Sequence, residues 1–250
     1  MTVTLTSSAR TSTPPADATG AALRLPRTVA VDRLASVTSL AELVDRLGGI
    51  PLERIHLHPW PGTATEEDVV EWNERGVGPV CELVDGTLVE KAMAGMESGF
   101  ETILLTELVL HDRKTKQLRA FTASMMNRMA GGNVRSPDVS VYTRTRLAEI
   151  YPGGKITREP KVWEVVPELV VEVLSGSNTA AEMDRKSSEY FEKGSREMWL
   201  LDPVARTLEV RKPGEEVLTL AVDQAVTTDL FPGFSISLTA WFEEAEDTTA

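Results

Sequence analysis

Apolar residues recur at two different spacings along the chain, and each spacing predicts a different kind of element. In "ESGFETILLTELVLHDRK" they recur at intervals of three and four residues, which predicts an amphipathic helix packed on a sheet. Short apolar runs on both sides of Asp85-Gly86 predict a hairpin, because this dipeptide adopts the positive φ angles of a tight turn. A second hairpin is expected around Asp202-Pro203, and "LRAFTASMMNRMAGGNVRSPDVSVYT" is typical of two or three further strands.

A strand, a helix and a second strand follow one another between Leu169 and Leu201. The first strand is a nearly continuous apolar run, and the helix is expected from about Ala180 to Lys193, with Gly194 as its end. Elsewhere the predicted strands outnumber the helices. The pattern therefore predicts an α/β (α+β) protein with a mixed central β-sheet flanked by helices.

The chain before residue 65 has a different composition. Its first part is rich in Thr, Ser, Ala and Pro, which is typical of a disordered tail. Thr38 opens a short helical stretch that Gly48 ends, and Thr65 with Asp68 matches a capping box at the start of the next helix. The chain is therefore expected to divide into a disordered tail (1–34), an N-terminal helical extension (35–64), a main domain (65–243) and a C-terminal tail (244–250).

The charge balance limits the possible partners. The net charge of -12 disfavours non-specific attraction to nucleic acids or anionic membranes, so a nucleic-acid partner requires a local group of cations. The candidates are Arg113, Lys114, Lys116, Arg119, Arg144 and Arg146. The single cysteine and the lack of a long apolar run indicate a cytoplasmic protein that does not cross a membrane.

Glu172 stands inside the apolar strand, where a charged carboxylate is costly unless it is protonated, paired or bound to a metal ion. By alternation Val171 and Val173 share one face, and Glu172 shares the other with Val170 and Leu174. A solvated face or pairing with an arginine would explain Glu172 simply, but the first of these would also expose two apolar neighbours.

A second carboxylate, Asp138, stands after Pro137 at the start of another alternating segment. Two carboxylates on neighbouring strands would form an oxygen site suited to Mg²⁺ or Mn²⁺. Lys186 lies on or beside the apolar stripe of the helix that follows Glu172, where it could orient a water molecule or neutralise a phosphate, or only extend its stem over the core. Glu82, in the first hairpin, is a further candidate whose burial the pattern leaves open.

Three segments together resemble a known family. "SPDVSVY", the block from Pro167 to Val210 and the hairpin "CELVDGTLVEK" are similar, in order and spacing, to the bacterial restriction endonucleases of the Uma-two type, which belong to the PD-(D/E)XK nuclease superfamily. The resemblance covers roughly residues 65–243. It implies a restriction-endonuclease-like core with one divalent-metal site.

The resemblance also implies roles for individual residues. Asp138 and Glu172 would be the two acids that bind Mg²⁺, and the backbone carbonyl of Val173 would be a third ligand. The superfamily places its lysine two residues after the second acid, where this chain has Leu174; the family moves the lysine to the following helix, which matches Lys186. Glu82 would match an acid counted with the site. Many members carry a histidine before the next helix, and "GMESGFETIL" has none.

Three functions are consistent with these residues. The first is a Mg²⁺-dependent endonuclease that hydrolyses phosphodiester bonds of nucleic acid, in particular DNA, and acts as a homodimer. The second is a binding module for nucleic acid or protein that retains the nuclease fold without catalysis. The third is a structural protein in which Glu172 pairs internally with Lys186.

Overall fold

The computed structural model describes residues 37, 39–76, 78–92, 95, 97–123, 125–157 and 159–247. The tail expected over residues 1–34 lies outside them. The last helix, α7 (Leu238–Glu246), continues beyond the expected boundary at residue 243. No helix among the described residues has both the length and the apolar character that crossing a membrane requires.

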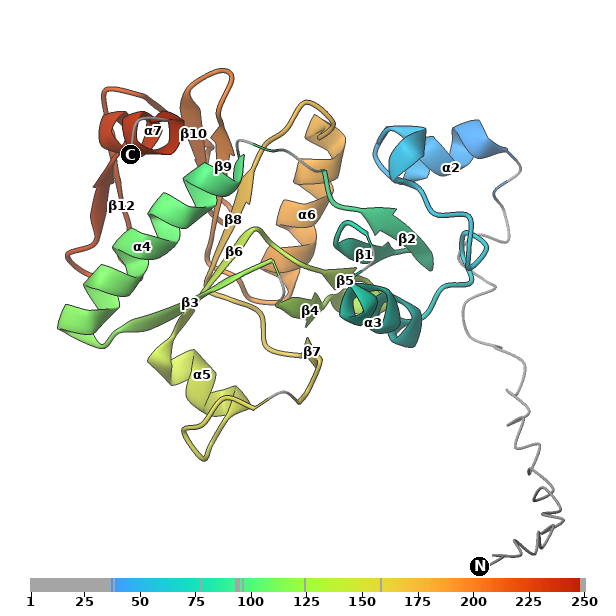
Figure 1. Cartoon of the computed structure of the whole chain (residues 1–250), viewed down its shortest axis with the longest axis horizontal. Helices are drawn as coiled ribbons and strands as arrows, with labels where there is room; N and C mark the ends of the chain where they lie inside the picture. Colours follow the sequence, from blue (N-terminus) through green and yellow to red (C-terminus); the bar gives the residue numbers. More distant parts are fainter. Residues whose placement is uncertain are drawn as a thin grey trace, which may run out of the picture.

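Six strands form the larger sheet, in the order β11-β10-β9-β8-β6-β3 (Figure 1). They are β3 (Leu118–Thr122), β6 (Val139–Thr143), β8 (Leu169–Val173), β9 (Glu197–Asp202), β10 (Thr207–Arg211) and β11 (Leu218–Ala221). β8 and β9 run parallel, while the other neighbours pair antiparallel. Parallel neighbours need a crossover, and helix α6 (Ala180–Glu192) provides it.

Helices cover both faces of this sheet. On one face, α4 (Glu97–Thr115) and α7 share a core with β8 that includes Phe100, Leu104, Leu108, Val171, Val173 and Trp241. On the other face, Val170 packs in one cluster with Met183 and Tyr190 of α6. Strand β8 is therefore buried on both faces, and alternation directs Glu172 to the face that α6 covers.

Five shorter strands form a second mixed sheet, in the order β2-β1-β5-β4-β7. They are β1 (Cys81–Val84), β2 (Thr87–Glu90), β4 (Met126–Arg128), β5 (Val134–Arg135) and β7 (Val162–Trp163). Helix α3 (Glu66–Arg75) packs on this sheet through Val69, and the predicted capping box of Thr65 and Asp68 begins it. Smaller elements of the domain are η2 (Ala130–Gly132), α5 (Arg144–Ile150) and the pair β12 (Ala225–Thr227) and β13 (Ser235–Ser237).

The predicted hairpin joins β1 to β2. Asp85 and Gly86 have φ angles of 48° and 70°, as a two-residue turn of this type requires. A Cβ atom on Gly86 would lie 2.6 Å from the carbonyl oxygen of Gly62, so a larger residue would also collide with the neighbouring backbone.

The mixed α/β architecture predicted from the sequence is confirmed, but the described strands form two large sheets and a two-stranded one where one central sheet was expected. The segment 118–143 contains four strands instead of two or three. The chain passes from β5 in one sheet to β6 in the other through Ser136, Pro137 and Asp138. Because Pro137 has no amide hydrogen to donate to a ladder, it favours a break in pairing at this point.

The N-terminal extension packs against the second sheet. It contains the short helix α2 (Leu40–Arg46), capped by Ser39, and η1 (Leu52–Arg54). Thr38, where the helix was expected to begin, lies outside the described residues. Leu43, Leu47 and Ile50 form one buried cluster with Val84 and Val89 of the β1–β2 hairpin, so the extension is docked on the domain.

Arg54 joins the extension to α6. Its guanidinium is buried and donates two hydrogen bonds to the Glu182 carboxylate, at 3.0 and 2.6 Å. It also donates to the carbonyl oxygens of Ser177, at 2.9 Å, and Glu90, at 2.8 Å. One side chain thus connects the extension, the end of β2 and the start of the helix that carries Lys186.

We predict that Arg54→Met lowers the free energy of unfolding by about 3–5 kcal/mol, because Glu182 would remain buried without its main partner. Urea denaturation measures the change. Arg75→Met is the matched control, since Arg75 pairs with Glu71 on the surface at 3.5 Å and its side chain is 64% exposed. The control should change stability by less than about 1 kcal/mol. Equal losses in the two variants would contradict an anchoring role for Arg54.

Candidate active site

Three carboxylates predicted to be functional are brought together where the two sheets adjoin. Glu82 lies on β1, Asp138 directly precedes β6, and Glu172 lies on β8. All three residues are buried. Since Val139 pairs with Val171 in the antiparallel ladder, the next position of the same register places Asp138 opposite Glu172.

Lys186 reaches this group from α6. Its ammonium nitrogen lies 3.2 Å from Oε1 of Glu172 and 3.3 Å from Oε1 of Glu82, and the residue is 1% exposed. The stripe position inferred from the helix periodicity therefore corresponds to a side chain enclosed between two carboxylates. The simple alternative, a stem over the core with its charged end in water, does not describe this lysine.

Lys91 is a second lysine of the cluster, and the sequence analysis did not identify it. Its ammonium nitrogen lies 2.6 Å from Oδ1 of Asp138 and 3.5 Å from Oε2 of Glu172, and it donates a hydrogen bond to the carbonyl oxygen of Ser136. The signal for it was present in the hairpin. The two-residue turn pairs Glu82 with Val89, so Lys91, two residues further along, lies on the same face as Glu82.

Arg135 is a further member of the cluster that the sequence did not reveal, although it directly precedes the "SPDVSVY" segment that contains Asp138. Its guanidinium donates to Oε2 of Glu82 at 2.9 Å and to Oε2 of Glu189 on α6 at 2.6 Å. The amide of Ser136 donates to the other oxygen of Glu82, at 3.0 Å. Both oxygens of Glu82 therefore accept hydrogen bonds, and Lys186 of α6 pairs with the same carboxylate.

The surroundings shift the pKa values of the cluster in different directions. Burial raises the pKa of the Glu172 carboxyl to about 7, although Lys186 and Lys91 oppose the shift. Burial acts in the same sense on Glu82, but Lys186, Arg135 and Lys91 outweigh it and lower the pKa of that carboxyl to about 2. Burial lowers the pKa of Lys186, and the two neighbouring carboxylates more than reverse that effect, so the net shift is upward.

The oxygens around Lys91 fit a divalent cation. Asp138 and Glu172 each direct one carboxylate oxygen at the Lys91 ammonium group, which itself stands where a cation would be bound. The other oxygen of Asp138 accepts a hydrogen bond from the amide of Val173 at 2.8 Å, which fixes that carboxylate against β8. The donors are hard oxygens of the kind Mg²⁺ and Mn²⁺ prefer. The described residues contain no group of three or more acidic, histidine or cysteine side chains arranged to hold a metal ion, so two carboxylates and backbone oxygens are the available ligands.

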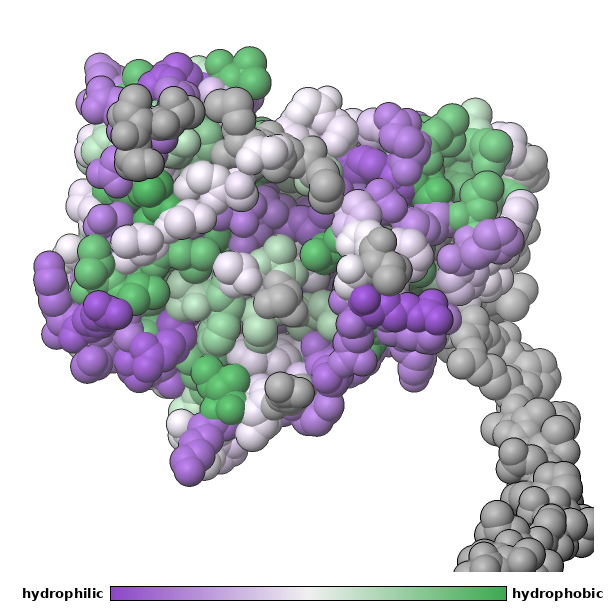
Figure 2. All heavy atoms as spheres, viewed as in Figure 1, coloured by the Kyte–Doolittle hydropathy of each residue, from purple (hydrophilic) through white to green (hydrophobic). Residues whose placement is uncertain are grey.

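Three of the four arginines considered as nucleic-acid contacts are engaged within the protein. Arg119 and Arg144 both pair with Asp112, and Arg146 donates to the carbonyl oxygen of Gly194 at 2.7 Å. Figure 2 shows hydrophilic residues gathered at lower left, over the C-terminal end of α4. Arg113 and Lys114 belong to this end of the helix.

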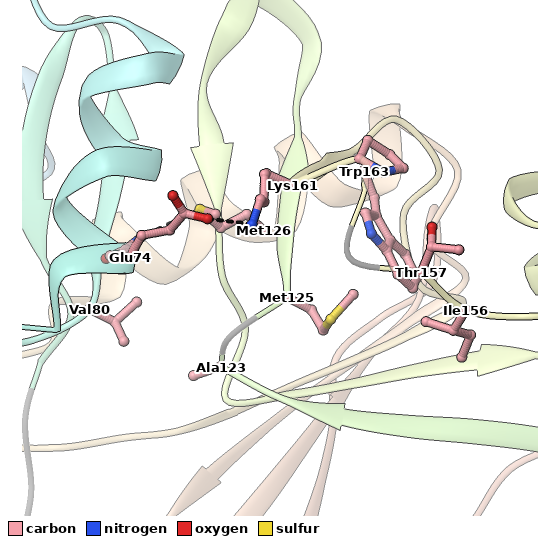
Figure 3. A pocket seen from close by; sticks show the side chains of 11 residues that line it. Glu74, Val80, Ala123, Met125, Met126, Ile156, Thr157, Lys161 and Trp163 are labelled. Atoms are coloured by element: carbon pink, nitrogen blue, oxygen red, sulfur yellow. Dashed lines mark hydrogen bonds and ion pairs between the residues drawn. The ribbon is translucent and has the colours of Figure 1, made fainter.

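A cavity of about 440 Å³ lies away from the acidic cluster, between α3, β4 and the segment before β7. Figure 3 shows the Lys161–Glu74 ion pair on one side of it and Ile156 and Trp163 on the other. No residue of the cluster lines this cavity. The cavity is therefore not part of the site formed by the buried carboxylates and lysines.

Comparisons with known proteins agree with this fold. Residues 67–239 match the Uma2 family model, whose description is "Putative restriction endonuclease". A solved structure of a protein described as a putative nuclease belonging to DUF820, from Anabaena variabilis ATCC 29413, matches with a TM-score of 0.60 and 20% sequence identity. The match covers 67% of this chain and 92% of that one. No curated protein sequence matches the chain.

The pKa of Glu82 predicts a pH-dependent contribution to stability. A carboxyl whose folded-state pKa lies below its ordinary value of 4.5 stabilises the fold above that value, and this contribution is lost as the pH falls towards about 2. The difference in unfolding free energy between the wild type and Glu82→Gln should therefore be largest near neutral pH and decrease at acidic pH.

Urea denaturation at a series of pH values from neutral to acidic checks this. Glu53→Gln, at an exposed position of η1, is the control and should differ from the wild type by no more than about 0.5 kcal/mol throughout. A wild-type advantage over Glu82→Gln that grows as the pH falls would contradict the assignment.

Proposed function

The chain belongs to the Uma2 family, and on that premise we propose that it is a Mg²⁺- or Mn²⁺-dependent endonuclease that hydrolyses phosphodiester bonds of DNA. The observation that carries the proposal is the pair Asp138 and Glu172, which lie opposite each other on neighbouring strands and direct one oxygen each at a shared cation position. Lys186 lies beside the same pair, on the other oxygen of Glu172. Two acids and a lysine in this arrangement suit metal-assisted phosphate hydrolysis.

Each residue has a distinct part in the proposed reaction. Asp138, Glu172 and the carbonyl oxygen of Val173 would hold the metal ion, which when bound lowers the pKa of water and stabilises charge on the phosphate. Lys186 would orient the attacking water or offset the negative charge that develops on the scissile group. Glu82 acts on Lys186, because its carboxylate lies 3.3 Å from that ammonium group and holds it in place.

Two further parts of the proposal concern assembly and location. Cleavage of both strands requires two sites, so we propose a homodimer as the active form. We also propose a cytoplasmic location, where the one cysteine, Cys81, stays reduced.

One observation favours a different function. The three carboxylates are neutralised without a metal ion, by Lys91, Lys186 and Arg135. In particular, Glu172 forms the ion pair with Lys186 that a purely structural role of the two residues requires. A non-catalytic binding module that retains the nuclease fold is the second candidate. Metal-dependent cleavage distinguishes the two functions, since the module has none.

Cleavage of a mixed pool of supercoiled plasmid, single-stranded DNA and RNA, with Mn²⁺ or with EDTA, tests the proposal. We predict metal-dependent cleavage of DNA by the wild type and a loss of at least about 10²-fold in Glu172→Gln, the usual order for removal of one charge-stabilising group. Glu74→Gln makes the same chemical change at a surface ion pair outside the cluster and should retain activity.

Circular dichroism of each variant establishes that a loss of activity is not a loss of fold. Equal cleavage by Glu172→Gln and the wild type would contradict the assignment of the site. A complete lack of metal-dependent cleavage across the pool would favour the binding module.

A further inference from the structure

Lys91 occupies a position built entirely from oxygen atoms. Its ammonium group contacts Oδ1 of Asp138, Oε2 of Glu172 and the carbonyl oxygen of Ser136, and the residue is 8% exposed. These contacts come from the junction between the sheets and from β8, while Lys91 itself follows β2. The lysine therefore reaches across to the acids from a different strand.

The oxygens that Lys91 contacts are those that no other part of the cluster uses. Oδ2 of Asp138 already accepts the amide of Val173, and Oε1 of Glu172 already accepts Lys186. Withdrawal of the Lys91 ammonium would free one oxygen on each acid and leave both of those hydrogen bonds in place. Lys186, in contrast, lies between Glu82 and Glu172 and contacts the oxygen of Glu172 that Lys91 does not.

The sum of the charges in the cluster also indicates that Lys91 would have to leave when a divalent ion binds. Three carboxylates, Glu82, Asp138 and Glu172, face three cations, Lys91, Lys186 and Arg135, and these six groups sum to zero charge when all are ionised. Glu189, the second partner of Arg135, is paired in turn with Arg185 at 2.9 Å. A dication added to this neutral group would bury two uncompensated charges, which is costly. If Lys91 leaves, a dication together with one phosphodiester anion restores neutrality.

We propose that Lys91 is a resident cation that holds the metal position of the metal-free protein and must be displaced when a divalent ion binds. This inference rests on the proposed function and adds a regulation of the same site. The long, flexible stem of a lysine allows the ammonium group to withdraw while the backbone stays in the hairpin. Only the small fraction of molecules in which Lys91 is withdrawn can bind the metal ion. The apparent association constant is therefore the intrinsic one multiplied by that fraction.

Calorimetric titration with Mn²⁺ alone tests the inference on the full-length wild type, Lys91→Met and Lys161→Met. Lys91→Met keeps the apolar stem and removes the competing charge, so its dissociation constant should fall by about tenfold or more, which corresponds to about 1.4 kcal/mol. Lys161→Met removes another carboxylate-paired lysine, outside the cluster, and should bind as the wild type does. Glu172→Gln should show no Mn²⁺ binding at the concentrations that saturate Lys91→Met.

Loss of a buried positive charge also weakens the fold, so two further measurements accompany the titration. In thermal melting, saturating Mn²⁺ should raise the melting temperature of Lys91→Met more than that of the wild type. Lys91→Arg keeps the charge and can hold the acids through two nitrogens, so it should bind Mn²⁺ more weakly than the wild type does.

The outcomes separate this inference from the proposed function. Equal dissociation constants for the wild type and Lys91→Met, with binding lost in Glu172→Gln, would overturn the role of Lys91 and leave the metal site standing. Saturable binding in Lys91→Met with weaker or undetectable binding in the wild type would support the displacement. Folded wild type and Lys91→Met that both fail to bind Mn²⁺ would overturn the inference and the metal-dependent mechanism together.

Discussion

Charge buried where the two large sheets meet has to be neutralised for this fold to be stable. Carboxylates removed from water are tolerated only when cations and hydrogen-bond donors surround them. Six charged side chains meet where the two large sheets adjoin. Five come from strands or the residues next to them and one comes from a helix: Glu82, Lys91, Arg135, Asp138, Glu172 and Lys186. Because the partners come from both sheets and from α6, the cluster defines how these parts meet.

The N-terminal extension strengthens one side of this junction. It precedes residues 67–239, the segment that matches the Uma2 family model. Arg54 binds Glu182 one turn before Lys186 on α6, and Thr179, the residue that caps this helix, donates a hydrogen bond to the carbonyl oxygen of Gly48. The extension thereby fixes the start of the helix that carries a lysine of the candidate site.

The features visible in the sequence were those that depend on local pattern. A carboxylate within an apolar run identified Glu172, helical periodicity placed Lys186 near the buried side of α6, and Asp85-Gly86 gave the hairpin. The division of the strands into two sheets could not be predicted, because it depends on which distant strands pair on either side of Pro137.

The two missed cations differ in how they could have been found. Lys91 could have been predicted from the sequence, because the register of the hairpin alone places it on the same face as Glu82. Arg135 offered no comparable signal: its partner Glu82 lies 53 positions earlier in the chain, and its other partner is on α6. Ion pairs between such distant residues follow from the tertiary fold and leave no periodic trace in the sequence.

In the proposed site, Asp138 and Glu172 bind a cation, and Lys91 takes the place of the divalent ion. Anomalous diffraction from crystals grown with Mn²⁺ would locate a bound ion. We expect a manganese peak between Oδ1 of Asp138 and Oε2 of Glu172, with the Lys91 ammonium group withdrawn and Lys186 still on the other oxygen of Glu172. Crystals at saturating Mn²⁺ with no peak at these oxygens, and with Lys91 still between the two acids, would contradict it.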